Sequence, residues 1–238
     1  YDKARFTGWH TAFPDARYEI DLASERRLVE ENGTPLFLLT FVGKDGDLHP
    51  ICPRSLLKRV LAVAESMGYR AELAFEYEFF VFEETAHSVR EKDYRDLKNF
   101  TPGNFGYSIL RNSTESDLYH EFMDYCDSMD TAIEGLHCET GPGVWEAALA
   151  HRDALAMADA AALFKTFTKV FFQKRDLLAT FMAKWSMDYP GQSGHLHQSL
   201  VDLKSGQNVF HKDGAEHGMR SEERRVGKAC RSRRSPYP

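Results

Sequence analysis

The chain has 238 residues, enough to bury the core of one large domain. Hydrophobic residues make up 42% of it and charged residues 28%, which is ordinary for a globular protein. The formal net charge of −6 gives no reason to expect a nucleic-acid partner, and no apolar run is long enough to cross a membrane. The four cysteines have no C-x-x-C spacing, so we expect a reduced, cytoplasmic setting rather than a disulfide framework.

The first fifty residues predict a small β unit. Residues 18–22 alternate like a short strand, residues 31–33 (ENG) are typical of a hairpin turn, and residues 35–42 form an apolar strand. A helix is predicted over residues 53–67, because proline suits its first position and Gly68 suits the residue after its end. Its predicted buried stripe consists of Leu57, Val60, Leu61 and Ala64.

Residues 71–84, AELAFEYEFFVFEE, predict the central strand of the fold. Both faces of this strand are largely apolar, which predicts that it is covered on two sides. Glu76 and Glu78 nevertheless share one face. Two neighbouring carboxylates in a covered position must be protonated, paired with cations or bound to metal. The alternative is a solvated strand face, which E-x-E pairs commonly form.

The middle of the chain predicts two more helices. Residues 84–104 are charged and irregular and predict a surface excursion, and a helix follows over residues 117–129 with Thr114 as a possible cap. The sequence Gly-Pro-Gly at 141–143 excludes a single helix over residues 133–149. A long helix is predicted over residues 153–174. Its predicted core face consists of Met157, Ala161, Phe164, Phe167 and Phe171.

Two strands are predicted near the end, over residues 177–184 and 195–201, joined by a glycine-rich loop. The loop lacks the strand–loop–helix context of a P-loop, so it does not by itself indicate nucleotide binding. From residue 220 the sequence becomes rich in arginine and almost free of apolar residues. We interpret residues 220–238 as a basic tail that is not native to the domain, and the alternative is a disordered basic tail of the protein itself.

Three clusters of side chains suit metal binding. They are Glu76 with Glu78, Glu139 with Glu146 in HCETGPGVWE, and His195 with His197 and Ser199 in SGHLHQSL. Sets of ligands dominated by carboxylates suit Mg²⁺ or Mn²⁺. Four carboxylates and a histidine suit two or more ions that clamp a phosphoryl group. Each cluster also has a structural reading, since carboxylates near turns are common and paired histidines occur in cores.

The order and wording of these segments resemble the glutamine synthetase family. FEYEFFVFE is similar to that family's E-P-E-F-F-L-F strand, and HCETGPGVWE to its E-V-x-P-G-Q-W-E segment. TFMAKWSMDYPGQSGHLHQSL is similar to its T-F-M-P-K-P and G-S-G-M-H-V-H-Q-S-L segments, and the helix between them also matches. The resemblance covers roughly residues 6–219.

The resemblance implies an α+β fold with a curved, mainly antiparallel sheet backed by helices. Residues 51–219 would be part of the catalytic domain, and residues 1–50 the remnant of an N-terminal β-grasp domain. Trp9 resembles the end of a loop that in the family reaches a neighbouring subunit's active site. The resemblance therefore also implies a homo-oligomer of stacked rings.

Carried over by position, the resemblance implies roles for nine residues. Glu78, Glu139 and Glu146 would hold one divalent ion, and Glu76 and His195 would hold a second. Glu134, His197 and Ser199 would meet the nucleotide, and Gly191 would lie near the substrate glutamate. Pro190 stands where the family often has asparagine, which leaves open which amino acid is bound or how it is held.

The implied reaction is ATP-dependent formation of a γ-glutamyl amide on two ions of Mg²⁺ or Mn²⁺. Its partners would be glutamate, ATP and ammonia, as in glutamine biosynthesis, with no covalent enzyme nucleophile. One alternative is a ligase of the same family that accepts a larger amine such as a polyamine, and another is a non-catalytic structural relative. We expect further family residues to follow Met219, and therefore expect this chain alone to be inactive.

Overall fold

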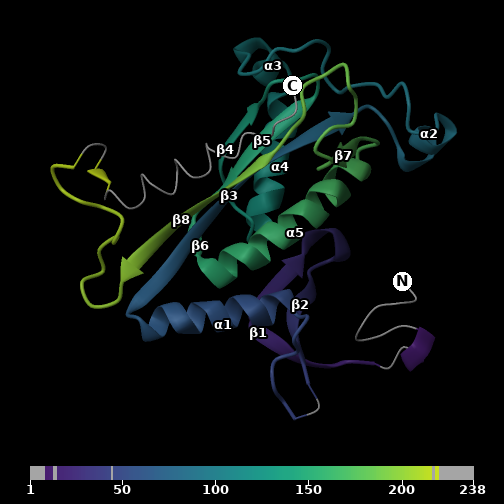
Figure 1. Cartoon of the computed structure of the whole chain (residues 1–238). Helices are drawn as coiled ribbons and strands as arrows, with labels where there is room; N and C mark the ends of the chain where they lie inside the picture. Colours follow the sequence, from purple (N-terminus) through teal and green to yellow (C-terminus); the bar gives the residue numbers. More distant parts are fainter. Residues whose placement is uncertain (1–8, 13–14, 44, 216–217, 220–238) are drawn as a thin grey trace.

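The computed structural model describes residues 9–12, 15–43, 45–215 and 218–219. The described part of the chain forms two antiparallel sheets with helices packed against the larger one (Figure 1). The two-stranded sheet consists of β1 (Arg17–Leu28) and β2 (Thr34–Val42). The six-stranded sheet consists of β3 (Tyr69–Phe82), β4 (Ile133–Cys138), β5 (Val144–Leu149), β6 (Arg152–Asp153), β7 (Leu178–Thr180) and β8 (Gly194–Asp202). The helices are η1 (Trp9–Thr11), η2 (Val29–Glu31), α1 (Pro53–Ser66), α2 (Ala86–Glu91), α3 (Ile109–Thr114), α4 (Ser116–Ser128) and α5 (Ala154–Gln173).

Strand β3 is the centre of the larger sheet. Residues 76–80 pair with β5 and residues 72–73 with β6 on one side. Residues 69–77 pair with β8 and residues 80–82 with β7 on the other side. All of these pairings are antiparallel, so the predicted α+β class with an antiparallel sheet backed by helices is confirmed.

The main core lies on one face of this sheet, under α4 and α5. Phe79 and Val81 of β3 are fully buried there, with Trp145 of β5 and Phe164 of α5. In Figure 1, α5 crosses this face with α4 beside it, and α1 lies along α5 near the start of β3. The 3.6-residue period of α5 explains its placement, because Met157 and Phe164 share the buried stripe.

The opposite face of β3 is covered only toward its C-terminal end. Phe80 and Phe82 are fully buried there, packed with Val144, Leu97 and Trp185. Among the described residues, Glu76 and Glu78 are only partly buried, so the predicted cover on both sides is not found in this half of the strand. The carboxylates are therefore partly hydrated while they remain close to each other.

The β1–β2 hairpin is fastened to the helices by a cluster of ion pairs. The Arg54 guanidinium on α1 donates two hydrogen bonds to Asp159 on α5, at 2.9 and 2.8 Å, and one to Asp21 on β1 at 2.7 Å. The side chains of Arg54 and Asp159 are 12% and 9% exposed. A charge this little hydrated is stabilised only while its partners stay in place, so the cluster fixes the hairpin against both helices.

Most predicted elements are present, with four corrections. Residues 84–104 contain the short helix α2, and the strand predicted over 177–184 is only the three residues of β7. Thr114 is the last residue of α3 rather than the cap of α4. Val60 is 56% exposed, because α1 turns Leu57, Leu61 and Ala64 inward and leaves this position on its outer face.

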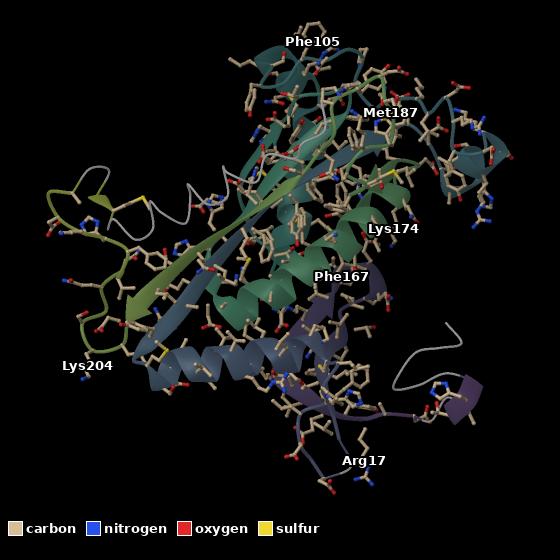
Figure 2. All side chains as sticks on the ribbon, in the orientation of Figure 1. Arg17, Phe105, Phe167, Lys174, Met187 and Lys204 are labelled. Carbon is tan, nitrogen blue, oxygen red and sulfur yellow. The ribbon has the colours of Figure 1, made fainter. Side chains whose placement is uncertain are left out.

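The predicted boundaries of the domains remain predictions. The tail at residues 220–238 and the start of the FTGW segment lie outside the described residues. Within the described part of the chain, no helix is long and apolar enough to span a membrane. Lys204, in the turn after β8, lies at the opposite end of the molecule from Phe105 (Figure 2).

Candidate metal centre

The register of four strands brings the predicted ligands to the open face of the sheet. Glu76 on β3 is paired with His195 on β8, and Glu78 is paired with Glu146 on β5. His137 on β4 is paired with Glu146 in turn. Since directly paired residues point to the same face, the open face carries a row of carboxylates and imidazoles across β8, β3, β5 and β4.

Glu76 lies between two imidazoles at one end of this row. Its Oε2 is 3.1 Å from Nδ1 of His195 and 3.2 Å from Nε2 of His197. The hydrogen bond from His197 lowers the pKa of the Glu76 carboxyl, with the charges of both imidazoles acting in the same direction against burial. Glu76 is therefore ionised at neutral pH, as a metal ligand must be.

A second group forms at the other end of the row. Nε2 of His137 lies 3.0 Å from Oε2 of Glu146 and 3.5 Å from Oε2 of Glu139. Burial raises the pKa of Glu139, but hydrogen bonds from Tyr107 and Thr140 outweigh it and the pKa is lowered. The same hydrogen bond to Glu139 raises the pKa of the Tyr107 hydroxyl to about 12, so this hydroxyl stays protonated and donates.

Glu146 is the carboxyl of this row whose pKa is raised. Burial raises its pKa, and the charges of Glu78, Glu76 and Glu139 raise it further, while His137 lowers it. A carboxylate surrounded by three others is stabilised in its charged form by a bound cation. The row therefore has the electrostatic character of a cation site rather than of a solvated strand face.

Glu78 is held by the loop before β8. Its two carboxylate oxygens accept hydrogen bonds from the backbone N–H of Ser193 at 3.1 Å and from the Ser193 hydroxyl at 3.2 Å. The loop itself is fixed by the buried Gln192 side chain, which donates to the carbonyl of Met182 at 2.8 Å. Glu78 thus has a fixed orientation toward Glu146 without a cationic partner among the described side chains.

The ligand atoms fit a divalent ion. Two groups of side chains each place one ligand atom within 4.8 Å of the others: Glu76 with Glu146 and His195, and His137 with Glu139 and Glu146. Nε2 of His137 and Oε2 of Glu139 are both buried and without a hydrogen-bond partner. Buried polar atoms normally have a partner, so two unpartnered atoms that lie 3.5 Å apart fit an ion held between them.

The remaining predicted residues lie around these groups. His197 and Ser199 follow His195 along β8 and line a cavity of about 270 Å³ together with His151. Glu134 is exposed at an irregularity of the β4–β5 pairing. Gly191 packs so closely that an added Cβ would lie 2.7 Å from the carbonyl of Ala183, which is a structural reason for glycine at this position.

Two residues of the site were not predicted from the sequence. His137 lies two positions before Glu139 on the same strand face, so the alternation of a strand contained the signal for it. Tyr107 carried no such signal. It has a left-handed φ of 58°, its N–H donates to the carbonyl of Cys138 at 2.8 Å, and its ring stacks on His137 with centroids 5.0 Å apart.

Comparison with known proteins identifies the class. The family model described as "Glutamine synthetase, catalytic domain" matches residues 50–226. The chain is 40% identical to Type-1 glutamine synthetase 2 of Dictyostelium discoideum over 210 residues, which are 88% of this chain and 40% of that protein. It is 32% identical to glutamate–isopropylamine ligase of a Pseudomonas species, over 88% of this chain and 45% of that protein.

The solved structure of GmaS without ligand superposes with a TM-score of 0.76 at 25% identity, over 88% of this chain and 48% of that one. The chain therefore belongs to the glutamine synthetase family. It spans less than half the length of each of these proteins.

Proposed function

We propose that the protein acts in the ATP-dependent formation of γ-glutamyl amides from glutamate and ammonia or an amine. In the first step an oxygen of the γ-carboxylate attacks the γ-phosphorus of ATP, and ADP leaves. In the second step the amine nitrogen attacks the acyl carbon, inorganic phosphate leaves, and the nitrogen loses a proton. The observation that supports this reaction best is the convergence of Glu76, Glu78, Glu139, Glu146 and His195 on one open face.

The residues of this face would bind and orient the reactants. Glu78, Glu139 and Glu146 would hold one ion of Mg²⁺ or Mn²⁺, and Glu76 and His195 a second. When bound, the ions would neutralise charge on the phosphate oxygens during transfer. Ser193 keeps the Glu78 carboxylate turned toward this face, and Tyr107 does the same for Glu139. No side chain has to act as a nucleophile, because both steps transfer groups between substrates.

The nucleotide would lie along β8, beyond the ion held by Glu76. The cavity lined by His197 and Ser199 borders that ion site, which supports their proposed role at the nucleotide. Glu134 would meet the nucleotide from the edge formed by β4, and Gly191 would lie near the glutamate. The supporting evidence for these two residues is their position in the family's motifs, and the assembly into stacked rings is proposed on the same basis.

The identity of the amine has two candidates. Ammonia is favoured by the 40% identity to a protein named glutamine synthetase. A larger amine is favoured by the 32% identity to a protein named glutamate–isopropylamine ligase over the same share of the chain. Phosphate release by the complete gene product, measured with ammonia, isopropylamine and putrescine in turn, separates these alternatives. The third alternative, a non-catalytic relative, predicts no release with any of them.

Metal binding tests the proposal on this chain directly. Mn²⁺ at about a hundred times its Kd should stabilise the fold by about 2.7 kcal/mol and raise the Tm by roughly 5–10 °C. Glu78→Ala should remove most of this shift, whereas Glu65→Ala, a change of the same type on the exposed side of α1, should leave it intact. Equal shifts in the wild type and in Glu78→Ala would overturn the assignment.

A further inference from the structure

Among the described residues, His137 is the one imidazole that belongs to the group around Glu139 and Glu146. The pairing of β4 with β5 places it directly opposite Glu146, and its Nε2 is 3.0 Å from one carboxylate and 3.5 Å from the other. The three ligand atoms lie within 4.8 Å of one another, so a single ion could contact all of them. The imidazole thus occupies the place of a ligand rather than a neighbouring position.

The contacts among these atoms are not hydrogen bonds. Nε2 of His137 is buried and makes no hydrogen bond, although Oε2 of Glu146 is only 3.0 Å away. Oε2 of Glu139 is buried and equally unpartnered. Polar atoms that converge in this way without a hydrogen bond leave their hydrogen-bonding capacity unsatisfied, and an ion placed between them would satisfy it.

The ring of His137 is held in this orientation from behind. Tyr107 stacks on it with an interplanar angle of 20°, and the Tyr107 hydroxyl is fixed by its hydrogen bond to Glu139. The strand pairing fixes the backbone of His137, and the tyrosine ring covers one face of its imidazole. A pre-oriented imidazole binds an ion with little loss of side-chain freedom.

We propose that His137 is a direct ligand of the ion held by Glu139 and Glu146, and that this imidazole makes the position selective for Mn²⁺ over Mg²⁺. The inference rests on the proposed function, since it concerns the ion that the same site would use. Mg²⁺ favours oxygen ligands in octahedral geometry, whereas imidazole nitrogen favours transition ions. Glu78, which the donors of Ser193 already orient, would remain the third carboxylate of this ion, and its charge already acts on Glu146.

In the opposing interpretation, His137 is protonated, and its positive charge takes the place of the ion between the two carboxylates. An imidazolium between two carboxylates would form the same short contacts in a structure that holds no metal. In that case a metal ion has to displace its charge, and removal of the imidazole should leave Mn²⁺ binding unchanged or make it tighter. The two interpretations therefore predict changes of opposite direction for the same substitution.

Titration calorimetry on the full chain distinguishes them. We expect His137→Asn to weaken Mn²⁺ binding at this position about tenfold or more and to change Mg²⁺ binding far less. His120→Asn, the same change on the exposed side of α4, should alter neither affinity. Unchanged or tighter Mn²⁺ binding by His137→Asn would overturn the inference and leave the proposed function standing.

A spectroscopic test identifies the nitrogen itself. In the double variant His195→Asn with His197→Asn, both imidazoles beside Glu76 are absent, so ¹⁴N coupling to bound Mn²⁺ in pulsed electron paramagnetic resonance would come from His137. We expect that coupling to persist in the double variant and to disappear when His137→Asn is added. Bound Mn²⁺ without nitrogen coupling would overturn the inference alone. Failure of the wild type to bind Mn²⁺ at all would overturn it together with the proposed function.

Discussion

At the scale of single residues, Glu84 is a buried ionised group outside the candidate metal centre. Its side chain is 2% exposed, and its carboxylate accepts hydrogen bonds from the Lys92 ammonium, from the Ser88 hydroxyl at 2.6 Å and from the N–H of Lys98 at 2.8 Å. Burial raises the pKa of Glu84, but these donors outweigh it and lower the pKa to about 2. The Glu84 carboxylate thereby holds the segment of residues 85–98, which contains α2, against the end of β3.

We expect Glu84→Gln to destabilise the fold by about 1–3 kcal/mol at pH 7, because an amide replaces a charged acceptor of three donors. The folded-state pKa lies below the ordinary value of 4.5, so the contribution of the charge is present above about pH 4.5. It is lost as the pH falls toward 2. Urea denaturation at pH 7 and at pH 3 should therefore show a smaller difference between variant and wild type at the lower pH.

The neighbouring Glu83 provides the control, since Glu83→Gln makes the same change in a residue whose carboxylate pairs with the exposed Lys98 ammonium. We expect less than about 1 kcal/mol there. An equal loss in both variants would mean that net charge, rather than the buried contacts of Glu84, accounts for the effect.

The candidate site could be predicted in part at this scale. Glu76, Glu78 and His195 could be placed on shared strand faces because a strand has a side-chain period of two. Tyr107 could not, since its position depends on a left-handed backbone conformation and on a contact with His137 thirty residues away in the sequence. Contacts of this kind arise from tertiary packing and leave no local pattern.

At the scale of elements, the turn between β4 and β5 brings the backbone of Gly143 close to that of β3. Gly143 has a φ of +70°, its carbonyl accepts from the N–H of Val81 at 2.7 Å, and its own N–H donates to the hydroxyl of Thr101 at 2.9 Å. A Cβ added to Gly143 would lie 2.4 Å from the carbonyl oxygen of Val81. The hydrogen bond between Gly143 and Val81 therefore holds the turn between Glu139 and Glu146 against β3.

We expect Gly143→Ala to destabilise the fold by roughly 2–5 kcal/mol, because the backbone strain and the overlap with Val81 add. Gly206→Ala isolates the strain, since Gly206 has the same φ of +70° with open space around it, and should cost about 1–2 kcal/mol. Denaturation midpoints of the two variants measure the difference. Equal losses of stability in the two variants would mean that overlap with Val81 adds nothing to the backbone strain at Gly143.

The sequence predicted an element correctly where a long periodic segment was bounded by a recognisable capping residue. α5 begins after Asp153, which accepts a hydrogen bond from the N–H of Leu155, and its apolar residues repeat over twenty positions. α2 and α3 have six residues each and no room for a periodic pattern. Val60 fits the apolar period of α1 but is exposed. Hydrophobicity alone does not identify which apolar positions pack against another element.

At the scale of the whole molecule, the sheet has a protected face and an open one. The core lies under α4 and α5, whereas the ligand row lies on the open face and ends on β8. Among the described strands, β8 pairs only with β3, and its residues 194–198 are exposed. β5, by contrast, lies between β3 and β4 over the core. Local opening should therefore be easier for β8 than for β5.

Metal binding should change the ease of local opening by different amounts in β8, in β5 and in the β1–β2 hairpin. Without metal, we expect the amides of β8 to exchange with deuterium faster than those of β5. Saturation with Mn²⁺ should slow exchange in β8, because His195 must stay in place for the ion to remain bound and local opening of this strand releases the ligand. The β1–β2 hairpin carries no proposed ligand and should show little change. Hydrogen–deuterium exchange followed by mass spectrometry measures all three segments in one experiment.

His195→Asn separates this local effect from general stabilisation. The variant removes the β8 ligand of the ion at Glu76 and leaves His137, Glu139 and Glu146 intact, so Mn²⁺ should still protect β4 and β5 while β8 loses its added protection. Equal slowing in β8 and in the hairpin, unchanged by His195→Asn, would show that the ion acts on global unfolding only. The strand that bears His195 would then be no part of the metal centre, and only the group around Glu146 would remain.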